Sequence, residues 1–197
     1  MKIKNLIFDI GGVIVLNKKV DFSKFDNKFS LPKGKAKEIV MGCFSKKMTD
    51  KNFDEKTFFQ KNFSNSLNWK NYQKMLKEIF KNEKVNTSLL NWIEKRRKNY
   101  KIYLLTNNTA ALHRLLREKF KIESIFDSVF NSAEIGLAKP DLEFFKYLLK
   151  KIGTSSEECL FVDDNPKNIK SAENIGFRAI LFENNKKFLE RAKELGI

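Results

Sequence analysis

The chain has 197 residues, 42% of them apolar and 32% charged, so it can bury a compact core and is neither a disordered chain nor a minimal peptide. No stretch approaches the ~20 consecutive apolar residues of a membrane-spanning helix. The formal net charge is +15, but 33 of the 39 basic residues are lysines scattered along the chain, whereas base-reading surfaces favour arginine, so we expect a solvated basic surface and no nucleic-acid partner.

The N-terminal segment predicts a buried strand over residues 3–8, which ends at Asp9 and is followed by a turn containing Gly11 and Gly12. A second short apolar stretch occupies residues 13–16. The first apolar run is shorter than the hydrophobic region of a secretory signal, and no small-residue cleavage site follows it. We therefore expect a cytoplasmic protein.

Residues 17–85 have a different character. Aromatic and aliphatic residues recur there at spacings of three and four, which predicts three or four amphipathic helices broken near 31–34 and 65–66. We expect the aromatic side chains to form the core of a small helical bundle. They include Phe22, Phe25, Phe59, Phe63, Trp69 and Tyr72.

From residue 87 onward, short apolar strands alternate with helical segments of about ten residues, a pattern typical of a parallel sheet covered on both faces. The first of these helices has Thr87 or Ser88 as its predicted N-cap. The helices are predicted over 87–98, 110–120, 141–152, 166–175 and 185–195, and the strands over 102–105, 129–130, 159–162 and 179–182.

The order of these elements predicts a doubly wound α/β fold, with a parallel sheet and a helical bundle inserted after its first strand. The α/β core is expected to comprise residues 1–16 and 86–197. The insert, which we call the cap, is expected to comprise residues 17–85.

Polar residues follow several of the predicted strands. They are Asp9, the pair Thr106-Asn107, the Lys139 that precedes a helix, and the pair Asp163-Asp164. In an open parallel sheet, ligands bind beyond the carboxyl ends of the strands. Each residue alone is an ordinary cap or turn residue, but their joint placement predicts one site.

Four motifs in this order resemble those of the haloacid dehalogenase-like hydrolase superfamily. They are LIFDIGGV at 6–13, LLTN at 104–107, GLAKP at 136–140 and LFVDDN at 160–165. The resemblance spans the chain outside the insert, and the insert lies where many members carry a small helical cap. The nearest likeness is to the sugar-phosphatase branch that includes α-glucose-1-phosphatases.

The resemblance implies a Mg²⁺-dependent phosphatase that hydrolyses a small phosphorylated metabolite, such as a sugar phosphate. Asp9 would attack phosphorus and form an aspartyl phosphate. Thr106, Lys139 and the backbone N–H groups near Gly12 and Asn107 would bind the phosphoryl oxygens.

The metal site implied by the resemblance uses oxygen ligands, as Mg²⁺ prefers. Asp9, the Gly11 carbonyl, Asp163 and Asp164 would supply them. The charge of the metal would offset the repulsion between the attacking carboxylate and the phosphate.

One position departs from the family pattern. Phosphatases of the superfamily usually carry a second aspartate two residues after the nucleophile, as the general acid–base, and here Gly11 occupies that position. Asp21 or an acidic residue of the cap is a candidate substitute. General acid–base catalysis typically contributes on the order of 10²–10⁴-fold, so turnover should depend on the leaving group.

Two other functions stay open at this point. A catalytically impaired phosphate-binding or scaffolding protein would explain Gly11. A metal-independent dehalogenase would share the Asp nucleophile, but the Asp163-Asp164 pair favours a metal-assisted phosphatase. The single histidine, His113, and the two cysteines, Cys43 and Cys159, are interpreted as packing or surface residues rather than catalytic groups.

Overall fold

The structure is a computed structural model that describes residues 2–16, 20–50, 52–81, 84–109 and 122–197. A five-stranded parallel sheet forms its α/β part, in the order β5-β4-β1-β6-β7. The sheet strands are β1 (Asn5–Phe8), β4 (Lys101–Thr106), β5 (Ser128–Asn131), β6 (Cys159–Asp163) and β7 (Arg178–Leu181). The predicted doubly wound α/β fold is confirmed.

Helices cover both faces of this sheet because successive strand residues point to opposite sides. On one face, Leu6 and Phe8 pack in a buried cluster with residues of α5 (Thr87–Glu94) and α10 (Asn185–Glu194). On the other face, Ile7 packs with residues of α8 (Leu142–Ile152) and α9 (Pro166–Asn174). Strand β1 is therefore buried on both sides, which explains why residues 6–8 are apolar in succession rather than alternating. The first strand residue, Asn5, is also buried, and its Nδ2 donates to Thr154 Oγ1 at 3.0 Å.

The cap contains the helices α1 (Ser23–Lys28), α2 (Lys35–Lys47), α3 (Glu55–Phe63) and α4 (Trp69–Lys81). They have a buried cluster of their own, in which the rings of Phe59 and Tyr72 stack with centroids 4.7 Å apart. The Tyr72 hydroxyl donates to Glu55 Oε1 at 2.8 Å, so the one polar atom of that ring is satisfied. The aromatic residues pack as a bundle core, as their spacing predicts.

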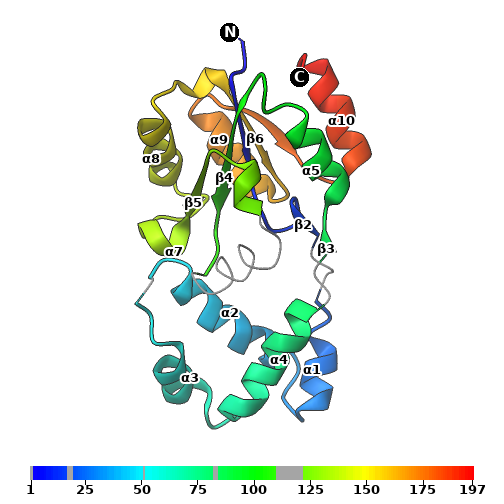
Figure 1. The fold of residues 1–197 in the computed structure, drawn as a ribbon. Coiled ribbons are helices and arrows are strands. Elements are labelled where there is room, and N and C mark those ends of the chain that lie inside the picture. The colour runs from blue at the N-terminus through cyan, green and yellow to red at the C-terminus, as the bar shows by residue number, and fades with distance from the viewer. Residues whose placement is uncertain (1, 17–19, 51, 82–83, 110–121) are drawn as a thin grey trace.

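Two short strands join the cap to the sheet. Strands β2 (Val15–Leu16) and β3 (Lys84–Val85) pair antiparallel, with Val15 opposite Val85. Figure 1 shows the carboxyl ends of the sheet strands pointing towards the cap, with this two-stranded ribbon between the two parts. The division of the chain into a core of residues 1–16 and 86–197 and a cap of residues 17–85 stays a prediction. The ribbon lies at both boundaries between these two parts.

Several local predictions need correction. The helix predicted over 87–98 ends at Glu94, and Asn86 rather than Thr87 or Ser88 caps it, because Asn86 Oδ1 accepts from the Leu89 N–H at 3.2 Å. Strand β3 and the short helix α7 (Ser132–Ile135) were not predicted.

Two short 3₁₀ turns, η1 (Ile122–Ile125) and η2 (Ser156–Glu158), complete the described elements. The helix predicted over 110–120, and His113 with it, lies outside the described residues. Within the described part of the chain, no helix is both long and apolar enough to cross a membrane.

Candidate active site

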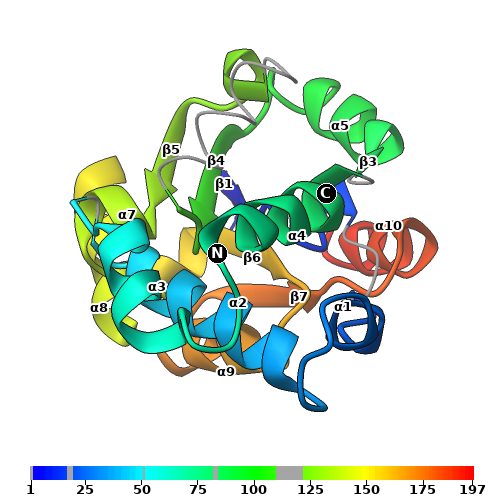
Figure 2. The same ribbon diagram turned by 90° about the horizontal axis from the view of Figure 1, so that it is seen from below.

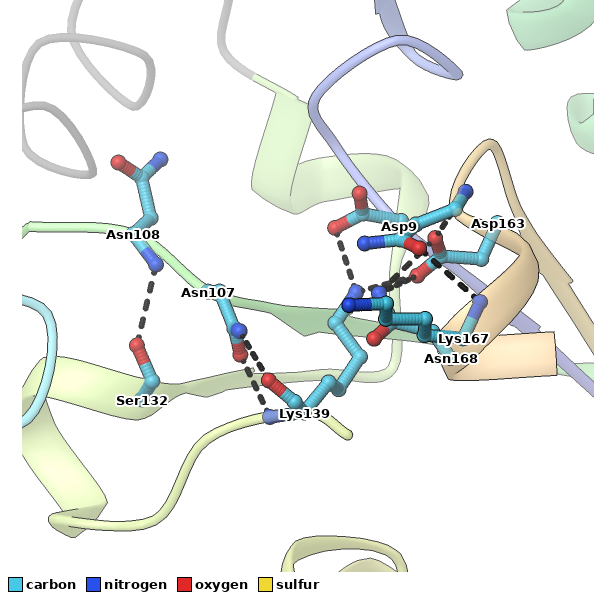
Figure 3. Close-up of polar contacts among 9 residues, drawn as sticks. Asp9, Asn107, Asn108, Ser132, Lys139, Asp163, Lys167 and Asn168 are labelled. Atoms are coloured by element: carbon cyan, nitrogen blue, oxygen red, sulfur yellow. Dashed lines mark hydrogen bonds and ion pairs between the residues drawn. The ribbon is translucent and has the colours of Figure 1, made fainter. Parts of the chain in front are cut away.

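Lys139 joins two carboxylates at the carboxyl edge of the sheet (Figure 3). Its Nζ lies 2.8 Å from Asp9 Oδ1 and 2.6 Å from Asp163 Oδ2. Asp9 directly follows the central strand β1, and its N–H donates to the Val162 carbonyl of β6 at 2.9 Å. Asp163 ends β6. The structure therefore brings together residues that are 130 and more positions apart in the sequence, as the strand-end argument predicts.

Asp163 is wholly buried, and protein donors use both of its oxygens. Oδ1 accepts from the Asn165 N–H at 2.8 Å, and Oδ2 accepts from Lys139. Asn168 Nδ2 lies 3.0 Å from each oxygen. Because both oxygens already accept from these donors, the Asp163 carboxylate has little capacity left for a further ligand. Its evident task is to hold Lys139.

Asn107 fixes the backbone of Lys139. Its Nδ2 donates to the Lys139 carbonyl at 2.7 Å, and its Oδ1 accepts from the Lys139 N–H at 2.8 Å. The amide thus braces the loop that carries the lysine from the end of the neighbouring strand β4. From the sequence, only the backbone of Asn107 is expected to contribute, and the bonds of its side chain are an addition.

Thr106, the last residue of β4, lies at the same edge and is 2% exposed. The next residues are held from α7, because the Asn108 N–H donates to Ser132 Oγ at 3.1 Å (Figure 3). The Thr109 N–H donates to Asn108 Oδ1 at 2.8 Å. Both N–H groups are therefore used within the loop after β4, which the Asn107 side chain ties to Lys139.

Burial and neighbouring charges alter the protonation of this cluster. Burial raises the pKa of Asp9 to about 6, with Lys139 opposing the rise and Asp163 adding to it. Burial alone would lower the pKa of Lys139, but the two carboxylates outweigh that effect and raise it. Burial and the charge of Asp163 also raise the pKa of Asp164. At neutral pH we therefore expect Lys139 to be an ammonium beside an ionised Asp9.

The carboxylates of Asp9 and Asp164 fit a magnesium ion, with Asp163 in the same cluster. Ligand oxygens of Asp9, Asp163 and Asp164 all lie within 4.8 Å of one another. Gly12 has a φ of 76°, and a Cβ built on it would lie 2.1 Å from Asp164 Oδ2. Only glycine allows both this backbone conformation and this close approach of the carboxylate. Hard oxygen donors of this kind are the ligands that Mg²⁺ prefers.

Gly11 forms an isolated β-bridge with Val15 in the turn after β1. The residue that replaces the usual general acid–base aspartate is therefore part of a hydrogen-bonded turn. The proposed substitute Asp21 is exposed, and its carboxylate accepts from the N–H and hydroxyl of Ser23. Cys43 and Cys159 are buried within the cap and the sheet respectively, as expected of packing residues.

Asn107 was predicted only as a phosphate-binding residue, and the supporting side-chain bonds of Asn107 and Asn168 and the Asn165 N–H bond to Asp163 were not predicted. One signal was available for Asn168, which lies five residues after Asp163 in the first turns of α9. A helix that starts at a strand end directs its first turn back at that end, so a polar residue there is in reach of the carboxylate.

The chain was compared with known proteins. The sequence profile described as "Haloacid dehalogenase-like hydrolase" matches residues 6–182. D-ribitol-5-phosphate phosphatase from Bacteroides thetaiotaomicron is 27% identical over 92% of this chain and 93% of that protein. Sesquiterpene phosphatase astK from Aspergillus oryzae is 43% identical over 38% of each chain.

Solved structures share the fold over nearly the full length. A predicted HAD-like family hydrolase from Porphyromonas gingivalis has a TM-score of 0.79 and 22% identity, covering 99% of this chain and 98% of that one. The HAD family enzyme bt-2542 from B. thetaiotaomicron, in complex with magnesium and inorganic phosphate, has a TM-score of 0.76 and 22% identity, covering 93% and 96%. By contrast, the chain spans under half the length of several curated relatives, 38% for astK and 40% for flavin mononucleotide hydrolase 1 from Arabidopsis thaliana.

Proposed function

This chain belongs to the haloacid dehalogenase-like hydrolase family, and we propose that it is a Mg²⁺-dependent phosphatase of a small phosphorylated metabolite, such as a sugar phosphate. The observation that carries the proposal is the Lys139 ammonium between Asp9 and Asp163, with Asp164 close by. Phosphoryl transfer needs a nucleophile, a fixed positive charge and a metal ligand, and Asp9, Lys139 and Asp164 could supply them. The phosphatases among the relatives support the reaction class.

In the proposed reaction, an oxygen of Asp9 attacks phosphorus, the bond to the leaving-group oxygen breaks, and an aspartyl phosphate forms. Water then attacks that phosphorus and releases inorganic phosphate, which regenerates Asp9. Asp9 suits the role of nucleophile because its place after β1 fixes it at the open edge of the sheet. Its pKa of about 6 keeps most of it ionised at neutral pH.

The surrounding residues stabilise charge rather than transfer protons. Lys139 keeps its proton, because two carboxylates face it, and it presents a fixed positive charge beside the nucleophile. Thr106 and backbone N–H groups of the turn after Asp9 and at Asn107 would bind the phosphoryl oxygens. The Gly12 N–H itself is already used by the Val15 carbonyl.

We assign Asp9, Asp164 and the Gly11 carbonyl as the residues that would hold Mg²⁺. Asp163 belongs to the same cluster, but its oxygens are already used by Lys139, Asn165 and Asn168. When bound, Mg²⁺ supplies charge neutralisation between the nucleophile and the phosphate. Of the four metal ligands predicted from the sequence, Asp163 is therefore left out of this proposal. Its role is to hold Lys139 in place.

Gly11 shapes the substrate range of the proposed phosphatase. Gly11 offers no carboxyl group two residues after the nucleophile. We therefore expect a leaving group to depart with little help from an acid at this position. Anomeric sugar phosphates and aryl phosphates have leaving groups of lower pKa than simple alkyl phosphates and depend less on such help. We expect the cap to close over the site and select among them.

The test is a panel of phosphate esters with graded leaving-group pKa, assayed for phosphate release with Mg²⁺ and with a chelator. Asp9→Asn serves as the matched control, because it keeps the size of the side chain. We expect release that needs Mg²⁺, falls steeply with rising leaving-group pKa and disappears in Asp9→Asn. A parent protein that binds phosphate and Mg²⁺ but hydrolyses no ester would instead support the second candidate, an impaired phosphate-binding protein, which Gly11 favours.

A further inference from the structure

Asn86 lies at the point where the chain returns from the cap, directly after β3, and it is 2% exposed. Its backbone N–H donates to the Ile14 carbonyl at 2.8 Å. Its side-chain Nδ2 donates to the Val13 carbonyl at 3.1 Å. One residue thus holds two consecutive carbonyls of the turn that follows Asp9.

The rest of the Asn86 side chain is fixed by α5 and α10. Nδ2 also donates to Asn185 Oδ1 at 2.8 Å, and Asn185 Nδ2 donates back to Asn86 Oδ1 at 2.9 Å. The same Oδ1 accepts from the Leu89 N–H at 3.2 Å. Both protons of Nδ2 and two acceptor positions of Oδ1 are therefore used. Rotating this buried amide would break several hydrogen bonds at once, so it has one orientation.

The turn that Asn86 holds carries Gly11 and Gly12. It is closed by the Val15 N–H, which donates to the Ile10 carbonyl at 2.7 Å, and by the Gly12 N–H, which donates to the Val15 carbonyl at 2.8 Å. Val13 and Ile14 lie inside this closed turn. A shift of their carbonyls would move Gly12 against the Asp164 carboxylate, which already fills the place of its missing Cβ.

We propose that Asn86 is a positioning residue of the active site. It fixes the backbone at Gly11 and Gly12, which the proposed function uses for Mg²⁺ and the phosphoryl group, and it ties this backbone to the strand that returns from the cap. The inference rests on the proposed function. A structural cap of α5 would need only the bond from Leu89, whereas the Asn86 side chain adds a bond to the Val13 carbonyl of the active-site turn and a reciprocal pair with Asn185.

The variant Asn86→Ser separates the two roles. Serine is among the best N-cap residues, so α5 stays capped. Its short hydroxyl carries a single proton, which cannot replace the bonds of Nδ2 to both Val13 and Asn185. The matched control is Asn184→Ala, which removes the N-cap of α10, an acceptor for the Lys187 N–H at 3.0 Å, on the helix that Asn86 contacts.

The readouts are the Mg²⁺ dissociation constant by calorimetry without substrate, the melting temperature, and kcat and KM for one ester that the parent cleaves. Substitution of a residue that hydrogen-bonds to the groups holding a metal typically changes metal affinity by about 10–100-fold. We therefore expect Asn86→Ser to bind Mg²⁺ roughly 10-fold more weakly, with kcat falling more than KM rises. Asn184→Ala should lower the melting temperature and leave the Mg²⁺ constant and kcat at parental values.

Parental Mg²⁺ affinity and kcat in folded Asn86→Ser would overturn the proposal, and so would an equal loss in Asn184→Ala. If Asn86→Ser does not fold, Asn86→Asp decides, because it keeps an acceptor for the Leu89 N–H and removes the donor to the Val13 carbonyl. A weakened Mg²⁺ affinity in folded Asn86→Asp supports positioning by Asn86, and an unchanged one contradicts it. A parent protein that binds no Mg²⁺ would contradict the proposed function itself, which distinguishes the two failures.

Discussion

Gly11 stands two residues after Asp9, within the turn from β1 to β2. Because it has no side chain, this position cannot supply an acid to a leaving group. Unlike Gly12, Gly11 is not among the described glycines with a positive φ, so an aspartate there meets no left-handed backbone strain. We expect Gly11→Asp to raise the rate on alkyl phosphates by up to about 10²-fold and to change aryl phosphates little, because only poor leaving groups need the proton. The measurement is kcat/KM against leaving-group pKa, with Gly11→Ala as control. An unchanged slope in a folded Gly11→Asp protein would refute this role for the position.

Mg²⁺ affinity should depend on pH through Asp9. Because its pKa is raised to about 6, Asp9 is mostly ionised above pH 7 and mostly protonated at pH 5. The metal needs the ionised form, so its binding competes with the proton. We expect the affinity to be level above pH 7 and to fall by about tenfold per pH unit below 6. Calorimetric titration between pH 5 and 8 measures this, and a constant affinity over that range would contradict it.

Lys139 is the cation on which the charge balance of the site depends. Lys139→Met keeps much of the side-chain volume but leaves Asp9 and Asp163 buried without their counter-ion. Breaking a buried pair in this way costs about 3–5 kcal/mol of unfolding free energy. Without the lysine, which lowers the pKa of Asp9, that pKa should rise above its present value of about 6. A carboxyl whose folded pKa is raised favours folding when protonated, so the stability lost at pH 8 should be partly recovered at pH 5.

Denaturant unfolding of Lys139→Met at these two pH values is the measurement. Lys167→Met, which removes an exposed lysine from α9, provides the control for the loss of a surface charge. A loss of stability that is the same at both pH values would show that lost packing, rather than uncompensated charge, dominates.

At the scale of elements, the cap is held by its own aromatic cluster. Phe59 of α3 is fully buried and contacts the rings of Trp69 and Tyr72, with centroids 5.3 and 4.7 Å apart. Phe59→Ala should therefore cost about 3–5 kcal/mol within the cap. Because this cluster is separate from the two that cover the sheet, we expect Mg²⁺ affinity to survive while KM for the ester rises. Calorimetry and steady-state kinetics on the same sample test this, and loss of Mg²⁺ binding in the folded variant would contradict it.

The long periodic elements could be predicted from the sequence, and the short ones could not. Helix α8 shows its spacing over three turns, and a two-residue strand such as β3 has no period to detect. The N-cap of α5 was placed one or two residues late because Asn, Thr and Ser stand in succession at 86–88 and all three are good caps. Burial decides between them, since only the Asn86 side chain faces both the turn after Asp9 and α10.

The acids of the site were predictable because each one ends or follows a strand, and the lysine because it stands in a recognisable motif, GLAKP, before a helix. The amides that orient them were not, because their partners are set by tertiary contact. Asn107 braces Lys139 across 32 positions of sequence, and Asn86 meets Asn185 across 99. Nothing in the local pattern distinguishes these asparagines from the many on the surface.

At the scale of the whole molecule, the site lies where the sheet faces the cap. Figure 2, seen from the cap side, shows α2 and α4 crossing in front of the sheet. The cap also reaches the core next to the lysine loop, because the Thr49 carbonyl oxygen lies 3.9 Å from the position of a Cβ built on Gly136, three residues before Lys139. A movement of the cap would therefore displace the loop that carries Lys139. Through the β2–β3 ribbon it would also displace the turn after Asp9. The net charge of +15 gives an anionic substrate a favourable field in which to approach.

The central claim, that Asp9 accepts a phosphoryl group with the help of Mg²⁺, is tested most directly by phosphate release from a single aryl phosphate. The assay compares the parent protein and folded Asp9→Asn, each with Mg²⁺ and with a chelator. We predict release by the parent only when Mg²⁺ is present, no release by Asp9→Asn under either condition, and a melting temperature of the variant close to that of the parent. Release by Asp9→Asn at the parental rate, or release by the parent that is indifferent to the chelator, would contradict the account.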